Sequence, residues 1–328
     1  MKAIVFDRIG QPLDILYLAE LRLPEAKDNT VLVKMLAASI DAGDLCRLAE
    51  PRSGRSEPQL RQRVAGNHGV GIVRESGPGV AIKPGTMVAF CYHGSWAEYA
   101  AIPAQWLLPL PHDFPIGKGS QVFQLMFAWD LLEHAQVGPG QWLAIIAGYS
   151  PISMLVLQFA RSRGVNVIAI VDESRPDLDL RTLGAAGVID LSGHPRQLRS
   201  NVMDITAGKG VDAVVNSVGG PTMVELEQSM TAAARLVING GEHAHCGGPR
   251  ILDQSVVRVR PHPHIHRRLS APPQAHDHQV LLKVAEIAGH AGFRVPLSGA
   301  HFLDDFKAAI GKSLQEPGHG KRLFKISA

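Results

Sequence analysis

Residues 142–163, WLAIIAGYSPISMLVLQFARSR, decide the fold. The apolar run WLAIIA has the length of a central strand in a parallel sheet, and a tight turn around Gly148 follows it directly. The next segment has Pro151 near its first turn and Gly164 just past its end, which is the usual asymmetry of an α-helix. A strand, a tight turn and a helix in this order predict the phosphate-binding start of a dinucleotide-binding βαβ unit.

The turn is a poor match to the GxGxxG pattern of dinucleotide-binding proteins, because only Gly148 is a glycine. Ser150 is small, and its hydroxyl either binds a phosphate or caps the helix. Pro151 and Ile152 stand at the helix start, where outward-facing N–H groups bind a pyrophosphate, and Pro151 removes one of those groups. On this motif alone, a βαβ unit that binds no nucleotide remains an alternative.

The segments on either side repeat the alternation of strand and helix. A helix is predicted over residues 121–137, and helices near 195–206 and 221–231 alternate with the strands VNVIAIV, GVID, VDAVVN and ARLVING. Repeated βαβ units predict an α/β fold with a doubly wound parallel sheet, which we place in residues 120–262.

The first 119 residues predict an irregular all-β region that forms a partly open barrel. Strand-like segments (KAIVF, TVLVKMLAASI and VAGNHGVGIVRESG) are separated there by glycine and proline turns. Residues 263–328 hold a proline- and histidine-rich stretch, two helices and the closing strand KRLFKIS, and we expect them to pack against this region. The sequence therefore predicts two domains, 1–119 with 263–328 and 120–262.

Composition narrows the classes of partner. The net charge is only +3, with no basic block, so neither a nucleic-acid surface nor a membrane-binding surface is expected. No stretch reaches the roughly 18 apolar residues that span a bilayer. The three cysteines lack CxxC spacing, and the N-terminal residues lack the apolar run of a signal peptide. These features predict a soluble cytoplasmic protein.

Further cofactor-binding candidates follow the ends of the other predicted strands. Asp172 and Arg175 come after the second strand, where an acid that accepts from the ribose favours NAD and an arginine that binds the 2′-phosphate favours NADP. Turns after two later strands add a second set of candidates, because ligands bind at the carboxyl ends of strands in such sheets: Ser217, Val218, Gly219, Gly240 and Gly241.

Taken together, these segments resemble the medium-chain dehydrogenase/reductase superfamily, in which a GroES-like β-barrel catalytic domain accompanies a Rossmann domain. The match is carried by AGYSPISMLVLQFARSRGVNVIAIV (147–171), VDAVVNSVGGPTMVELEQSM (211–230) and ARLVINGGE (234–242). Within the superfamily the sequence is most similar to zinc-free quinone oxidoreductases and 2-enoyl thioester reductases. ESRP (173–176) stands where the enoyl reductases carry RDRP, so the resemblance favours NADPH through Arg175, and NAD stays possible.

The resemblance also implies what the chain lacks. Zinc alcohol dehydrogenases place a cysteine and a histidine where this chain has Asp41 and Asn67, so we expect no metal site. The enoyl thioester reductases use a tyrosine shortly after the segment that matches Asp41–Asp44, and the residues that follow contain none. Quinone oxygens can take protons from water, which favours a quinone or alkenal substrate over a fatty-acid one.

Asp41, His68 and His264 are the candidate catalytic residues. Asp41 is a candidate hydrogen-bond partner for substrate or nicotinamide, and each histidine is a candidate proton donor near neutral pH. A buried structural role is the alternative for His68, and a loop without function is the alternative for the histidine-rich stretch around His264. The resemblance further implies a homodimer, paired through the strand predicted at 254–260.

The sequence thus predicts an NAD(P)H-dependent reductase that transfers hydride to a quinone or an α,β-unsaturated carbonyl or enoyl substrate without zinc. The irregular phosphate turn and the missing tyrosine leave two alternatives open. One is a family member that acts as a binding protein, and the other is an NAD-dependent enzyme of the alcohol dehydrogenase type.

Overall fold

The computed structural model describes residues 1–49, 61–192, 197–217, 221–238, 261–263, 267–316 and 319–327. The chain divides into two compact units. Unit 1 comprises Met1–Gln124, Arg267–Ala291 and Val295–Ala328, and unit 2 comprises Leu125–His266 with Gly292–Arg294. The borders expected from the sequence, after residues 119 and 262, differ from these by a few residues.

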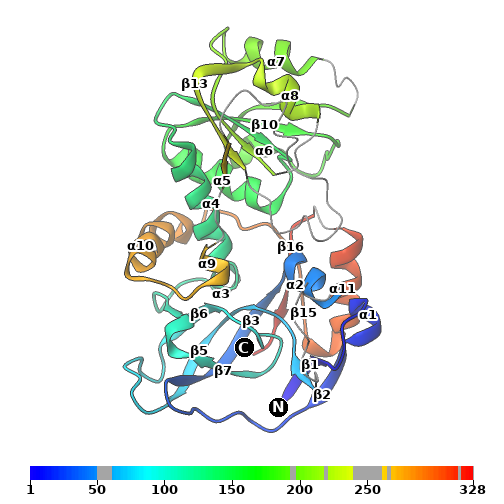
Figure 1. The fold of residues 1–328 in the computed structure, drawn as a ribbon, viewed down its shortest axis with the longest axis vertical. Coiled ribbons are helices and arrows are strands. Elements are labelled where there is room, and N and C mark those ends of the chain that lie inside the picture. Colours follow the sequence, from blue (N-terminus) through cyan, green and yellow to red (C-terminus); the bar gives the residue numbers. More distant parts are fainter. Residues whose placement is uncertain are drawn as a thin grey trace. The chain divides into compact units, whose positions relative to one another are not determined.

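Unit 2 contains a six-stranded sheet in which all described pairings are parallel. Its strand order is β11-β10-β9-β12-β13-β14. Strands β10 and β13 of this sheet are labelled in Figure 1. The order reverses on either side of β9, which is the arrangement of a doubly wound dinucleotide-binding sheet, so the predicted fold is confirmed. The strands are β9 (Trp142–Ile146), β10 (Asn166–Val171), β11 (Ala185–Asp190), β12 (Val211–Asn216), β13 (Met230–Ile238) and β14 (Pro261–Pro263).

Apolar side chains bury both faces of this sheet. Ala144 and Ile168 face a core cluster that includes Leu198 of α7 and Met223 of α8. Strand residues alternate between faces, so Leu143 and Val167 point the other way and are fully buried there. The described helices are α4 (Val122–Ala135), α5 (Pro151–Ser162), α6 (Leu180–Leu183), α7 (Leu198–Ile205) and α8 (Pro221–Glu227). The helix expected at 221–231 is shorter than predicted, because β13 already begins at Met230.

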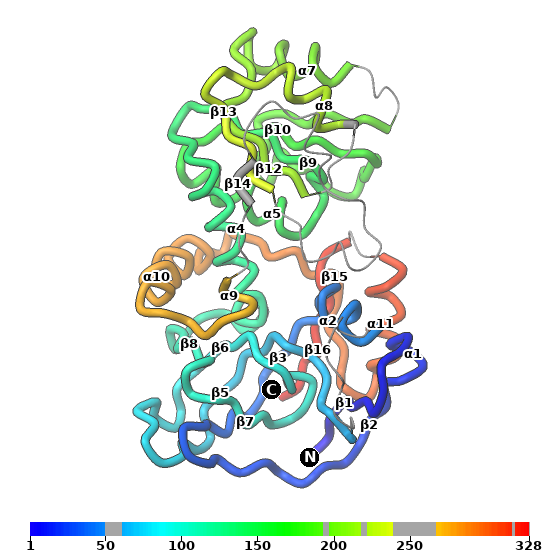
Figure 2. Tube along the Cα trace, in the orientation of Figure 1, coloured from blue at the N-terminus to red at the C-terminus, as the bar shows by residue number. Residues whose placement is uncertain are grey.

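Unit 1 is built around a seven-stranded sheet with the order β15-β16-β3-β5-β6-β8, and β7 also pairs with β3. The C-terminal strand β16 runs beside β3, red against blue in Figure 2. This pairing confirms that the closing strand packs against the N-terminal region. The strands are β3 (Thr30–Ile40), β5 (His68–Ser76), β6 (Met87–Cys91), β7 (Tyr99–Pro103), β8 (Leu107–Pro109), β15 (Leu297–His301) and β16 (Lys321–Lys325).

A smaller sheet of order β2-β1-β4 completes the β structure of unit 1, with β1 (Lys2–Phe6), β2 (Tyr17–Glu20) and β4 (Arg63–Val64). The prediction of an all-β N-terminal region was wrong, because residues 12–15, 42–49 and 116–119 are helical. Residues 42–49 form the helix α2 (Ala42–Ala49), which buries Leu45 and Leu48 against the core. The other helices are α1 (Pro12–Ile15), α3 (Ile116–Gly119), α9 (Arg267–Ser270), α10 (Ala275–Gly289) and α11 (Phe306–Gln315), with single 3₁₀ turns at Ala104–Trp106 and Leu303–Asp305.

Among the helices that the structure describes, none combines the length and the apolar character needed to cross a membrane.

Candidate active site

A row of four polar side chains crosses the sheet of unit 1. Three of them lie on strands β16, β5 and β6, and the fourth, Asp41, directly follows β3. Strand β16 pairs with β3 so that Arg322 lies opposite Ile40, which brings Lys321 next to Asp41. On the other side of β3, Ala38 lies opposite Gly69 of β5. His68 begins β5 and lies opposite Cys91, the last residue of β6. The row is therefore Lys321, Asp41, His68 and Cys91, and the strand register alone assembles it.

Asp41 is the most heavily contacted member of the row. Its carboxylate accepts hydrogen bonds from the Ser39 hydroxyl at 2.6 Å and from the Gln124 amide at 3.1 and 3.2 Å. Lys321 forms an ion pair with its Oδ1. Burial lowers the pKa of Lys321 to about 8, and the negative charge of Asp41 acts in the opposite direction by stabilising the ammonium form.

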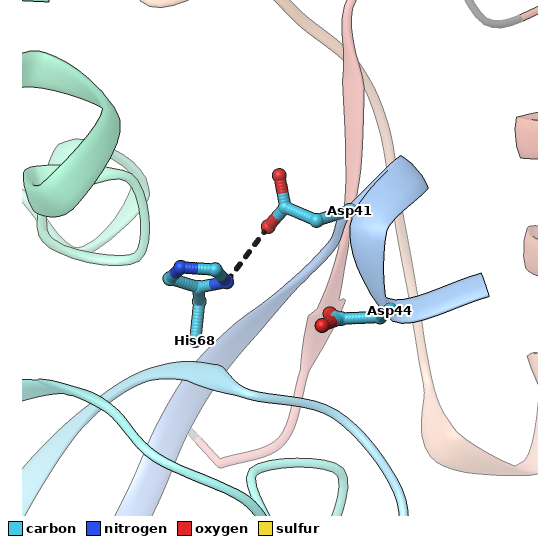
Figure 3. A group of neighbouring side chains, drawn as sticks. All are labelled: Asp41, Asp44 and His68. Atoms are coloured by element: carbon cyan, nitrogen blue, oxygen red, sulfur yellow. Dashed lines mark ion pairs between the residues drawn. The ribbon is translucent and has the colours of Figure 1, made fainter. Parts of the chain in front are cut away.

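His68 is buried and sits between a carboxylate and a thiol. Its Nδ1 lies 3.1 Å from Oδ2 of Asp41, an approach shown in Figure 3 that has the distance of an ion pair but not the angle of a hydrogen bond. Its Nε2 lies 3.2 Å from Sγ of Cys91. Burial lowers the pKa of His68, but Cys91 and then Asp44 outweigh that effect and hold the pKa above its ordinary value.

Asp44 lies in the first turn of α2, close to this row (Figure 3). One of its oxygens accepts a hydrogen bond from the Asn67 side chain, and the other is buried with no hydrogen-bond partner among the described residues. Burial raises the pKa of Asp44 above its ordinary value, against the opposing effects of His68 and Asn67. Asp44 is therefore a buried helical residue that adds to the electrostatic field around His68.

One ligand atom each from Asp41, Asp44 and His68 falls within 4.8 Å of the others, which is a spacing that a metal ion could use. Asp41, however, already has the Lys321 ammonium as its counter-charge. A divalent cation bound there would also lie beside that ammonium, and the two positive charges would repel each other. We therefore assign the counter-charge of Asp41 to Lys321 and assign no metal to this group.

The phosphate turn in unit 2 has the local form expected of an anion site. Ala147 adopts φ +60°, and the Ser150 side chain caps α5 by accepting from the Ser153 amide at 3.1 Å. Of the two roles open to Ser150, the structure thus shows the cap. Pro151 has no N–H and Met154 donates to the Ser150 carbonyl, so the Ile152 amide is the first-turn donor left for an anion.

Gly148 provides the close packing that this turn needs. A Cβ at this position would lie 3.0 Å from both Ala169 and Val171 of β10, and the Gly148 amide donates to the Ile170 carbonyl. The turn therefore lies directly against the second strand, as a cradle for a pyrophosphate requires.

The two residues expected to read the adenosine ribose differ in exposure. Asp172 is exposed, whereas the Arg175 side chain is buried, forms an ion pair with Asp177 and stacks over the Tyr149 ring at 5.4 Å. Tyr149 belongs to the phosphate turn, so the arginine is held beside the turn. A guanidinium in this position fits a 2′-phosphate group.

Several predicted residues lie outside the described part of the chain, namely Val218, Gly219, Gly240, Gly241, His264 and the strand expected at 254–260. Ser217 is described and follows β12 directly, at the carboxyl edge of the sheet. The predictions for the residues outside the described part of the chain stay predictions.

Sequence reasoning missed Lys321, Gln124 and Cys91. Each is distant from Asp41 and His68 along the chain, and only strand register and the start of α4 bring them together. The one available signal was a lysine followed by a second basic residue at the start of the closing strand KRLFKIS, where burial of a charge calls for a partner.

Known protein families match segments of both units. Residues 27–112 match the alcohol dehydrogenase GroES-like domain, and residues 151–259 match the family described as zinc-binding dehydrogenase. A mitochondrial enoyl-[acyl-carrier-protein] reductase of Xenopus tropicalis is 31% identical over 252 residues, covering 73% of this chain and 70% of that protein. The corresponding enzyme of Homo sapiens is 29% identical, and the alignment covers 74% of this chain and 66% of that protein.

Among solved structures, a protein assigned as an NADPH:quinone reductase from Bacillus thuringiensis superposes with a TM-score of 0.82 at 25% identity, covering 99% of this chain and 98% of that one. The alignments to the enoyl reductases span about two thirds of those proteins. These matches, the GroES-like unit and the doubly wound sheet lead to one conclusion. The chain belongs to the medium-chain dehydrogenase/reductase superfamily and is similar to its zinc-free quinone oxidoreductases and 2-enoyl thioester reductases.

Proposed function

We propose that this protein is an NADPH-dependent reductase that transfers hydride to a quinone or to an α,β-unsaturated carbonyl or enoyl substrate without zinc. The observation that carries the proposal is the match over 73% of the chain to an enoyl reductase, supported by the likeness of the fold to a protein assigned as an NADPH:quinone reductase. Hydride chemistry belongs to the cofactor, and the protein binds it, orients the acceptor and supplies a proton.

The proposal is tested by mixing the purified protein with NADPH or NADH and a panel of quinones, enals and enoyl thioesters, and by following the loss of reduced nicotinamide. We expect oxidation of NADPH with at least one acceptor. Binding of neither cofactor at millimolar concentration would overturn the proposal and favour a binding protein instead. Because no tyrosine follows Asp44 in LCRLAEPRSGR, we expect quinones and enals to be better acceptors than enoyl thioesters.

Arg175 is the proposed selector of NADPH, so Arg175→Ala should weaken NADPH binding about 10- to 100-fold, because a hydrogen bond to a charged group contributes about 1.5–3 kcal/mol. NADH binding should change little, since NADH carries no 2′-phosphate. Cofactor fluorescence gives both dissociation constants. Arg181→Ala is the matched control, as Arg181 is an exposed arginine on the neighbouring helix α6. Equal losses for NADPH and NADH in the Arg175 variant would contradict this role.

We propose Asp41 and His68 of unit 1 as the groups that face the reacting substrate, and His264 stays a further candidate. Their support is chemical, since a buried carboxylate and imidazole in contact can hold and deliver a proton. We also propose a cytoplasmic homodimer. The superfamily resemblance supports the dimer, which light scattering tests. Cys46 and Cys91 are not joined in disulfides in the described part of the chain, which fits a reducing compartment.

A further inference from the structure

Lys321 is the counter-charge of Asp41, and its position is unusual for a lysine. It is a lysine at the start of a strand, its side chain is 16% exposed, and it forms an ion pair with a carboxylate that is 8% exposed. Lysines are almost never this deeply buried unless they are paired. The next residue, Arg322, pairs with Glu316 instead, so of these two basic residues only Lys321 contacts Asp41.

The surroundings of the ion pair link it to His68. Asp41 receives Lys321 on Oδ1 and approaches Nδ1 of His68 at 3.1 Å with Oδ2, so one carboxylate joins the amine and the imidazole. The other charged or titratable groups that act on His68 are Cys91 of β6, and Asp44 and Arg47 of α2. The side chain of His68 is only 6% exposed, which makes Lys321 the more solvent-accessible end of this part of the row.

We propose that Lys321 is the positioning residue through which protons enter the row, passing by way of Asp41 to His68, and that this row supplies the proton of the reduction. The inference rests on the proposed function. The acceptor gains a hydride, with two electrons, from the reduced nicotinamide, and it gains a proton from the row. The row is then one proton short, and Lys321 recovers that proton from water.

Three physical points support this role. An ammonium beside Asp41 keeps the carboxylate ionised and able to accept a proton. An amine whose pKa lies near the working pH can both give and regain a proton, whereas an ordinary exposed lysine stays charged. The strand register also fixes the amine and the carboxylate side by side without a mobile loop.

The first test needs no activity. In cofactor-free protein labelled with ¹⁵N-lysine, the Nζ resonance of Lys321, assigned by its loss in Lys321→Met, should titrate near pH 8. In Asp41→Asn the midpoint should fall further, because the ammonium loses its counter-charge. A Lys321 midpoint at the ordinary lysine value, unmoved in Asp41→Asn, would overturn the inference.

The second test compares pH profiles of NADPH oxidation. In the native protein the rate should fall as pH rises past the Lys321 midpoint measured by NMR. In Lys321→Met and Lys321→Arg this fall in rate at alkaline pH should disappear, because neither side chain exchanges protons in this range. The rate itself should be about 10-fold lower or more in both variants. Lys325→Met, which removes the exposed lysine at the other end of β16, should leave rate and profile unchanged.

The outcomes of these tests distinguish a proton-transferring lysine from one that only balances the charge of Asp41. Full rate with the alkaline limb retained in Lys321→Arg would show that Lys321 is only a counter-charge, and would overturn the proton role. Dissociation constants for NADPH equal to those of the native protein show that the variants are folded and loaded. Absence of NADPH oxidation by the native protein with every acceptor would instead overturn the proposed function, while the NMR titration would still report whether Lys321 and Asp41 are coupled.

Discussion

A Gly66→Ala variant is expected to lose about 3–5 kcal/mol of its free energy of unfolding. Gly66 adopts φ +81°, a left-handed conformation that costs a residue with a Cβ about 1–2 kcal/mol. The added Cβ would also lie 2.2 Å from Cδ1 and 2.4 Å from Nε1 of Trp96. The indole cannot move aside easily, because it is fully buried and its Nε1 donates to the Ser39 carbonyl at 3.1 Å.

Gly85→Ala is the matched control for this variant. Gly85 has nearly the same backbone conformation, φ +86°, but a Cβ there meets no heavy atom within 4 Å. Gly85→Ala should therefore lose only the free energy of unfolding that the left-handed backbone conformation costs, about 1–2 kcal/mol. Urea unfolding followed by tryptophan fluorescence measures both variants. Equal losses would show that the contact with Trp96 contributes nothing.

The position of Gly66 also connects this stability effect to the site. Asn67 and His68 follow it directly, and Ser39, whose carbonyl holds Trp96, donates its hydroxyl to Asp41. Displacement of the Trp96 ring would therefore disturb both the turn before His68 and the strand before Asp41. We expect the Gly66 variant to lose reductase activity even below its unfolding transition.

The sequence predicted the Rossmann unit well because its signals are local. An apolar run such as that at Leu143–Ile146, a turn glycine at Gly148 and a helix after Ser150 can each be recognised within a short window. The strand order then follows from rules that govern how parallel strands are connected.

The candidate site could be predicted only in part, because its members meet through long-range register. Asp41 was found because it stands where zinc alcohol dehydrogenases place a ligand, and His68 because it directly follows Asn67, the second such position. Lys321 and Cys91 belong to the same row only because β16 and β6 lie in the sheet with β3 and β5, and no local pattern encodes those pairings. The burial of Arg175, against the exposure of Asp172, likewise depends on packing against Tyr149.

Asp277→Asn is expected to lose about 3 kcal/mol of the free energy of unfolding at pH 7, because it breaks a buried ion-pair network. Asp277 is 1% exposed, and its Oδ1 accepts from Arg267 at 2.5 Å and from Arg268 at 2.6 Å. Its Oδ2 accepts from the Gln274 amide at 2.6 Å, which caps α10. The network also holds α9, whose Leu269 carbonyl accepts from the Cys91 thiol at 3.4 Å.

The lowered pKa of Asp277 determines in which direction the loss of stability in Asp277→Asn changes with pH. Burial raises the pKa of Asp277, but the hydrogen bonds from Arg267, Gln274 and Arg268 outweigh burial and hold the pKa below its ordinary value. A carboxylate with a lowered pKa in the folded state stabilises the protein above its unfolded pKa, about 3.9, and this stabilisation is lost as pH falls through the folded value. The stability gap between the native protein and Asp277→Asn should therefore be full at pH 7 and shrink below about pH 4.

Urea unfolding across that range measures the gap, and Asp304→Asn, which removes an exposed partner of Lys2, should show little gap at any pH. A gap for Asp277→Asn that stays constant down to acid pH would mean that its cost comes from lost packing, with no contribution from the charge.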